Sequence, residues 1–208
     1  MTARTGTRTV GTRRGGSSGW LIALIAVVVT AMVQALLTRV PTDPGWSAAF
    51  VGLAVVSFAD AALGLWLVAS GIATTVRPNQ ASTIRGVAWT VVLLLVVVAA
   101  GVFVPLAVPV VVVPVGWLLA AVALGEPKPV RAAVRALRAA PGRHVLVALA
   151  TVVLAGVAWL VALVLGVLLP RLIGDAGTWL WFGLTAMVVL RMWCGLHRRV
   201  DSDPVAAG

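Results

Sequence analysis

Asp60 is the only acidic residue that lies well inside an apolar stretch of this sequence. A carboxylate within a bilayer is costly, so such a residue usually faces other helices and has a partner there. Arg191 is the candidate partner because it also lies in an apolar stretch. Asp60 follows Trp46 by 14 residues and Arg191 follows Trp179 by 12, which corresponds to depths of about 21 and 18 Å below one interface. The spacing therefore predicts an intramembrane ion pair between Asp60 and Arg191.

Two alternatives to this ion pair stay open at the level of the sequence. In the first, Arg191 extends its guanidinium to the interface, and Asp60 is protonated or bound to a hydroxyl group. In the second, Asp60 is a member of a proton relay. Comparing the stability of the two single charge deletions with that of the double deletion separates a pair from independent residues, because an ion pair gives non-additive losses.

The remaining reactive residue types do not form a recognisable site. His144 and His197 lie near the ends of apolar stretches, without a second His, Cys or acid at metal-ligand spacing, so we expect both to be interfacial. Cys194 is the single cysteine, which excludes an intrachain disulfide and suits a buried apolar position. No paired carboxylates, Ser-His-Asp set or GxxxxGK[ST] loop occurs. We therefore expect no enzyme activity, no catalytic residue, no metal and no cofactor.

A short basic segment over residues 129–140 predicts an amphipathic helix. Pro129 suits the start of a helix, and Pro141 with Gly142 suits its end. Its cations recur at the spacing of one helical face, namely Arg131, Arg135 and Arg138. Its larger apolar residues follow the same spacing and are predicted on the opposite side, namely Val130, Val134 and Leu137.

This amphipathic helix is too short and too charged to span a bilayer, so we expect it to lie in the interface. Each arginine near an anionic leaflet contributes about 1 kcal/mol. The candidate contacts for anionic lipid headgroups are Arg131, Arg135, Arg138 and Arg143. The alternatives are that the helix only anchors a loop and enforces topology, or that it contacts a cytoplasmic protein.

The elements that carry these residues are long apolar stretches. Hydrophobic residues make up 61% of the 208 residues and charged residues only 11%, whereas soluble domains have about 25% charged residues. Several stretches are long enough to cross a hydrocarbon core about 30 Å thick. The sequence predicts an all-α polytopic transmembrane bundle over residues 20–198. Its six spans are 20–37, 47–75, 87–104, 106–124, 145–169 and 178–196.

The third and fourth spans are derived from one uncharged stretch of 38 residues, 87–124. This stretch is too long for a single span at 1.5 Å per residue. Pro105, Pro109 and Pro114 interrupt its middle. Two spans joined by a tight turn near Val104–Pro109 fit this pattern. A re-entrant or broken helix, of the kind that lines cavities in transporters, is the alternative.

Within the spans, glycine and tryptophan residues are expected to pack between helices. Gly64, Gly71 and Gly156 are expected to allow close helix packing. Trp66 and Trp159 lie deeper than the interface and are expected to be packing residues.

The basic residues predict the orientation. Loops rich in Arg and Lys alternate along the chain with loops that have one or none. Both tails, 1–19 and 199–208, are therefore expected in the cytoplasm, the first of them disordered. The net charge of +10 is explained by this topology, and no soluble part remains to bind nucleic acid. Abundant Ala, Val, Gly and Arg with little Lys suggest a bacterial inner-membrane protein.

The basic segment also carries a resemblance to a known family. Glu126 precedes the amphipathic helix, Arg138-Ala139 closes it, and Gly142-Arg143 enters the next apolar stretch. This arrangement, over roughly residues 80–198, resembles the membrane domain associated with bacterial glycerophosphodiester phosphodiesterases and related stand-alone polytopic proteins of unknown role. Ala139 and Ala140 stand where that family commonly has Ser and an aromatic residue, and the catalytic domain is absent. The resemblance thus implies a fold and a membrane role, and no activity.

These observations favour a non-catalytic bacterial membrane protein that organises lipids or partner proteins. The expected partners are the bilayer and anionic lipid headgroups, or else a membrane or cytoplasmic protein. The alternative is the permease subunit of an ATP-driven exporter or another small transporter, which the predicted span count and termini also suit. A lipid-modifying enzyme that uses Asp60 or the basic helix ranks last, because no nucleophile–base pair is present.

Overall fold

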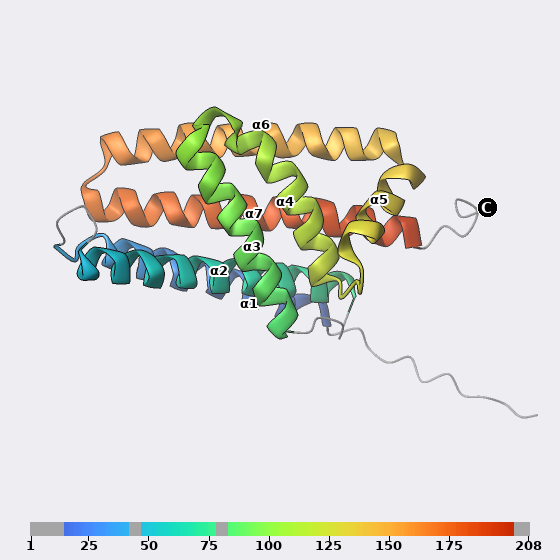
Figure 1. Cartoon of the computed structure of the whole chain (residues 1–208), viewed down its shortest axis with the longest axis horizontal. Helices are drawn as coiled ribbons and strands as arrows, with labels where there is room; N and C mark the ends of the chain where they lie inside the picture. The colour runs from blue at the N-terminus through green and yellow to red at the C-terminus, as the bar shows by residue number, and fades with distance from the viewer. Residues whose placement is uncertain (1–14, 42–46, 78–82, 202–208) are drawn as a thin grey trace, which may run out of the picture.

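The computed structural model describes residues 15–41, 47–77 and 83–201, which are almost entirely α-helical (Figure 1). No strand occurs among these residues. The elements in chain order are α1 (Gly15–Leu37), α2 (Ala48–Val76), α3 (Thr83–Phe103), the 3-10 turn η1 (Pro105–Ala107), α4 (Val108–Ala123), α5 (Pro129–Ala139), α6 (Pro141–Leu168) and α7 (Arg171–Asp201).

Six of these helical segments are long and apolar enough to cross a membrane. The predicted fold class is confirmed, with α5 as the additional short helix, and the chain is a multi-pass membrane protein. The six segments are Ser18–Leu37, Ala48–Val76, Thr83–Phe103, Pro105–Ala123, Pro141–Leu168 and Arg171–Arg198.

The last helix begins earlier than the sequence suggested. Only Leu169 and Pro170 separate α6 from α7, so residues 171–177, expected as a loop, form the first two turns of α7. The tails differ too, because residues 15–19 belong to α1 and residues 199–201 to α7. The rest of both predicted tails lies outside the described residues.

Four long helices run along a common direction. Figure 1 shows α1, α2, α7 and α6 alongside each other, with α1 behind α2. The helices α1, α2 and α7 contact one another, and α7 also contacts α6. The α3–α4 hairpin crosses these helices on one face, and because α4 contacts α2, α6 and α7, the hairpin connects α2 to the α6–α7 pair.

The hairpin is steeply inclined to the long helices. A Cβ on Gly86, near the start of α3, would collide with the indole of Trp66 in α2. Leu94, eight residues later, lines the same small cavity as Gly64 and Val68 of α2. Eight residues advance α3 by about 12 Å, yet both positions of α3 lie near the same part of α2. Figure 1 accordingly shows α3 crossing α2 rather than running beside it.

Two helices thus form from the uncharged stretch 87–124. Two of its three predicted breaks explain where the helices meet, whereas the third, at Pro114, was wrong because Pro114 lies inside α4. Pro105 starts η1, Pro109 lies in the first turn of α4, and both positions suit proline because the first amides of a helix have no partner within it. Figure 1 shows the turn of the hairpin over the middle of α6 and not at its end. The hairpin therefore combines the predicted tight turn with the inclination expected of a re-entrant segment.

Glycines allow close approach at the contact between α1 and α2. A Cβ on Gly71 would lie 2.7 Å from the carbonyl oxygen of Gly19, closer than a real contact permits, and one on Gly64 would collide with Thr30. Gly156 was predicted to act in the same way, but a Cβ there meets open space. Its interpretation as a packing residue was therefore wrong.

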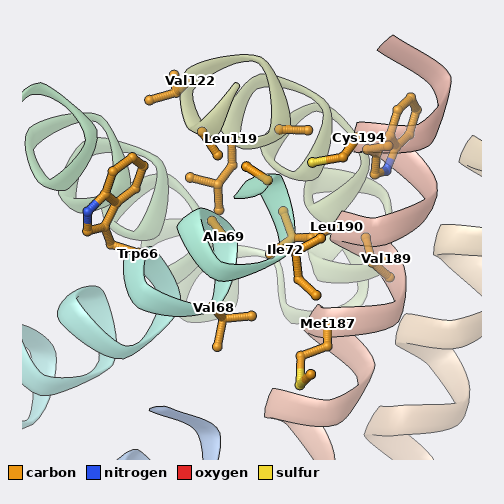
Figure 2. Packing of buried hydrophobic residues seen from close by; sticks show 14 of the residues in the cluster. Trp66, Val68, Ala69, Ile72, Leu119, Val122, Met187, Val189, Leu190 and Cys194 are labelled. Atoms are coloured by element: carbon orange, nitrogen blue, oxygen red, sulfur yellow. The ribbon is translucent and has the colours of Figure 1, made fainter. Parts of the chain in front are cut away.

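The main apolar core lies where α2, α4 and α7 meet. Ile72 of α2, Leu119 of α4 and Leu190 of α7 are fully or almost fully buried there, together with Cys194. Figure 2 shows these side chains gathered between the three helices. Trp66 belongs to this core as predicted, whereas Trp159 is 47% exposed and does not pack inside.

This core holds one end of the bundle together. The start of α1, the end of α2, the end of α7 and the start of α6 meet at that end, with α5 beside them (Figure 1). We call it the basic end, because most described cations lie there. The other end, called the opposite end, joins α1 to α2 and α6 to α7, and its described cations are Arg39 and Arg171.

Candidate functional site

Asp60 forms a polar cluster between α1 and α2. The side-chain nitrogen of Gln34 donates to Oδ2 of Asp60 at 3.0 Å and to the carbonyl oxygen of Ser57 at 2.8 Å. The hydroxyl of Ser57 donates to the side-chain oxygen of Gln34 at 2.6 Å. Gln34 is 2% exposed, so its amide is satisfied almost entirely within the protein. The cluster gives the intramembrane carboxyl group a neutral partner.

Arg191 lies elsewhere, and the predicted ion pair with Asp60 is not formed. The guanidinium of Arg191 donates to the hydroxyl of Thr75 at 2.7 Å. Thr75 follows Asp60 by 15 residues on α2, a distance of about 22 Å along the helix. The prediction assumed that Trp46 and Trp179 mark equal depths, but α7 begins at Arg171 and its early turns shift its register against α2.

The basic amphipathic helix exists as α5 and ends one residue before its predicted end. All three predicted lipid-contacting arginines on it are exposed, namely Arg131, Arg135 and Arg138. The side opposite these cations differs from the prediction because it carries alanines, and those are buried against the bundle. The buried positions are Pro129, Ala132, Ala133 and Ala136.

The larger apolar residues of α5 form a third side of the helix. Val130, Val134 and Leu137 are all exposed, and helical geometry places them about a quarter turn from the arginines. Alanines allow the helix axis to lie close to the bundle. The larger apolar side and the guanidinium groups are both left exposed, which is the arrangement expected of an interfacial helix.

Two contacts fix the loop that precedes α5. Arg77 pairs with Glu126, with 3.4 Å between Nη1 and Oε1. Arg85 donates from its guanidinium to the carbonyl oxygen of Pro127. The sequence did not predict these two contacts, because residues 49 and 42 positions apart give no local pattern that reveals them.

Arg143, the fourth predicted lipid contact, lies on α6 and not on α5. Its exposed side chain lines a cleft with two other arginines, Arg191 and Arg198 of α7. The structure therefore divides the four predicted lipid contacts between two locations. It also brings Arg191 and Arg143 together, which the sequence did not suggest.

His144 is buried rather than interfacial. It is 3% exposed, and its ring centroid lies 6.0 Å from that of Trp117 and 6.0 Å from that of Trp193. Its Nδ1 lies 2.9 Å from the carbonyl oxygen of Ala140. His197, also expected at the interface, is buried too. Among the described residues, no three His, Cys, Asp or Glu side chains gather in a way that would hold a metal ion.

The opposite end has a small polar site that sequence reasoning missed. Asp175 of α7 accepts a hydrogen bond at 2.8 Å from the hydroxyl of Thr38, just after α1. The two residues line a cleft of about 540 Å³ together with Arg39 and Arg171. Asp175 lies four residues after Arg171, but this helical spacing was hidden because the segment was assigned to a loop.

Comparison with family models, with curated proteins and with solved structures finds no match for this chain. The geometry of the described residues thus has no matched relative to compare it with. That geometry offers exposed guanidinium groups at one end of a membrane bundle and a neutral amide partner for its intramembrane acid.

Proposed function

We propose that this chain is a non-catalytic protein of a bacterial cytoplasmic membrane that gathers anionic lipids around its basic end. Both termini lie on the cytoplasmic side in this proposal. The observation that carries it is the exposed arginine side of α5, held at the surface of a membrane bundle by a buried alanine side.

The distribution of charge along the bundle supports the proposal. Described cations are concentrated at the basic end, whereas the opposite end has Arg39 and Arg171 with Asp175 between them. Positive charge is enriched on the cytoplasmic side of membrane proteins, where anionic lipids attract it. The cations of the basic end are Arg77, Arg85, Lys128, Arg131, Arg135, Arg138, Arg143, Arg191 and Arg198.

The resemblance to the membrane domain associated with glycerophosphodiester phosphodiesterases agrees with this role. The residues that carry it lie at the two ends of α5, where Glu126 pairs with Arg77 and Gly142-Arg143 begins α6. These residues set the position of α5 against the bundle. A protein that organises lipids or lipid-associated partners needs such a fixed interfacial helix and no reactive group.

Lipid analysis of the reconstituted full chain tests this proposal. The chain is placed in vesicles of phosphatidylcholine and phosphatidylglycerol, captured in polymer-bounded discs, and the lipids that remain are counted. We expect the discs to be enriched in phosphatidylglycerol relative to the vesicles. The Arg131→Gln/Arg135→Gln variant should lower this enrichment, because each removed cation weakens the attraction by about 1 kcal/mol.

The matched control removes two cations from the other side. Arg39→Gln/Arg171→Gln changes the net charge by the same amount but acts at the opposite end. In discs made from vesicles that carry phosphatidylglycerol only in the leaflet at the basic end, the lipids around this variant should equal those around the wild type. An equal loss of phosphatidylglycerol enrichment in both variants would mean that only the net charge matters, which contradicts the proposal. The absence of enrichment around the wild type would also refute it.

A transport subunit is the second candidate function, and two features favour it. The inclined α3–α4 hairpin has the form of segments that line cavities in transporters, and the Gln34–Asp60 cluster places a carboxyl group within the spans. Association of the chain with an ATPase that depends on added nucleotide would favour this function over lipid organisation.

A further inference from the structure

A cleft at the basic end lies between the start of α6, the end of α7 and the last residue of α2. Its volume is about 610 Å³. One helical side of α7 forms its floor, because Arg191, Gly195 and Arg198 follow each other at four and three residues. Arg143 reaches the same cleft from the first turn of α6.

The cations of this cleft are available to an anion. Arg191 is oriented by the hydroxyl of Thr75, which accepts from its Nη1 at 2.7 Å and itself donates to the carbonyl oxygen of Ile72 at 2.7 Å. That hydroxyl is neutral and leaves the charge of Arg191 uncompensated. Among the described side chains of residues 47–77 and 83–198, no acid forms an ion pair with Arg143, Arg191 or Arg198.

The other walls of the cleft are apolar. Val76, Leu146, Val147 and Leu196 line it beside the arginines. Leu146 lies one turn into α6 and is 66% exposed, so this wall continues onto the lipid-facing surface of a membrane-spanning helix. A soluble anion would leave these walls in contact with water, whereas a phospholipid matches both halves of the cleft.

The cleft is separate from the arginines of α5. Trp193 and Val189 of α7 face α4, where a Cβ on Gly116 would contact both. Trp193 is two residues from Arg191 and two from Gly195, which places it on the other side of α7. The helix α5 packs against α4 and also contacts α7 and α6, but none of its residues lines the cleft.

We propose that this cleft binds one anionic phospholipid. The phosphate lies between the guanidinium groups of Arg143, Arg191 and Arg198, which suit it because guanidinium binds phosphate through paired charge-assisted hydrogen bonds. An acyl chain follows Leu146 and Val147 toward the bilayer. This inference deepens the proposed function by adding a discrete site to the diffuse attraction of α5.

Native mass spectrometry of the full chain tests the site. The protein is released from mixed micelles that contain phosphatidylglycerol or phosphatidylcholine, and retained lipids are counted. We expect one phosphatidylglycerol to be retained by the wild type. Arg191→Gln should weaken its binding about tenfold, the effect of losing one charge-assisted hydrogen bond.

Gly195→Leu blocks the cleft without removing a charge. A Cβ on Gly195 meets open space, so the leucine side chain starts without a clash at its Cβ and extends into the cleft that Gly195 lines, and leucine improves helix propensity. We expect this variant to lose the retained phosphatidylglycerol while unfolding at the wild-type temperature. Gly156→Leu is the matched control, because a Cβ there also meets open space far from the cleft, and it should retain the lipid.

Three outcomes would overturn the inference. One is retention of phosphatidylglycerol by Gly195→Leu, and another is equal retention of phosphatidylcholine by the wild type. The third is complete displacement by glycerol 3-phosphate alone, which would indicate a site for soluble anions. Loss of the cleft lipid depends on Gly195 and Arg191, whereas loss of diffuse enrichment depends on Arg131 and Arg135, so the two proposals fail separately.

Discussion

Gln34 of α1 and Asp60 of α2 contact each other across the helix interface, with 3.0 Å between Nε2 and Oδ2. The same Gln34 amide also contacts Ser57 twice. This arrangement gives an intramembrane carboxyl group the Gln34 amide as its hydrogen-bond donor, without an opposite charge, and the Ser57 hydroxyl in turn donates to the side-chain oxygen of that amide. Interhelical hydrogen bonds of this kind contribute to helix association in membranes.

The first prediction concerns this cluster. Gln34→Leu should lower the free energy of unfolding by about 1–2 kcal/mol, because it removes the interhelical hydrogen bonds of Gln34 to Asp60 and Ser57. Denaturant titration of the chain in detergent micelles measures the loss. An unchanged stability would contradict the importance of the cluster.

The same system tests the two partners proposed for Asp60. Asp60→Asn combined with Arg191→Gln should give additive losses of stability. Arg191 contacts Thr75, which lies about 22 Å from Asp60 along α2, so the two charged side chains do not interact. Asp60→Asn combined with Gln34→Leu should give less than the sum, because the two residues are in contact. Non-additive losses for Asp60 with Arg191, together with additive losses for Asp60 with Gln34, would instead support an ion pair between Asp60 and Arg191.

A second prediction compares two glycines. Gly71→Ala should destabilise the bundle by about 1–3 kcal/mol, because the added methyl group is forced against the Gly19 carbonyl and Ala23. Gly156→Ala should leave the stability equal or slightly higher, because its methyl group meets open space. Thermal unfolding of both variants checks the prediction, and similar effects at the two sites would contradict the close contact of α1 and α2.

A third prediction concerns the tip of the α3–α4 hairpin. Leu106 is 92% exposed on η1, and in Figure 1 the steep inclination of the hairpin leaves its turn short of the opposite end along the long axis of the bundle. In vesicles, Leu106→Cys should be shielded by lipid from a membrane-impermeant maleimide added on either side. Arg39→Cys is the control at the opposite end and should react from one side. Labelling of both positions from that side would show that the hairpin crosses the membrane completely.

The fourth prediction concerns Cys194, whose thiol is the background in this labelling experiment. Cys194 is fully buried in the core between α2, α4 and α7, so its thiol should not react with maleimide in the folded protein. It should react once the chain is unfolded in strong denaturant. Mass spectrometry counts the label, and rapid labelling of the native wild type would contradict the packing shown in Figure 2.

The helices themselves were predictable because length and hydropathy decide them. Proline explains why the bounds of α5 were predictable, since Pro129 opens it and Pro141 opens the helix that follows. The start of α7 was not predictable in this way. Gly174, Asp175 and Gly177 have the composition of a loop, but with only two residues between α6 and α7 they continue a helix.

The contacts between helices were harder to predict from the sequence than the helices themselves. The partner of Asp60 depends on how far α1, α2 and α7 are shifted along their axes relative to each other. The positions of the tryptophans in the sequence do not determine these shifts. The inclination of α3 depends on Trp66 fitting against Gly86, residues 20 positions apart with no shared period. The burial of the alanine side of α5 follows from its packing against α4, which no local pattern reports.

The unequal charge of the two ends also has an electrical consequence. Where the membrane potential is negative on the cytoplasmic side, the field attracts the cations of the basic end to that side. Moving one elementary charge against this field costs about 2.3 kcal/mol for each 100 mV. Turning the bundle over would carry Arg131, Arg135, Arg143 and their neighbours through the whole potential drop. An energised cell would thus hold the protein in one orientation long after insertion is complete.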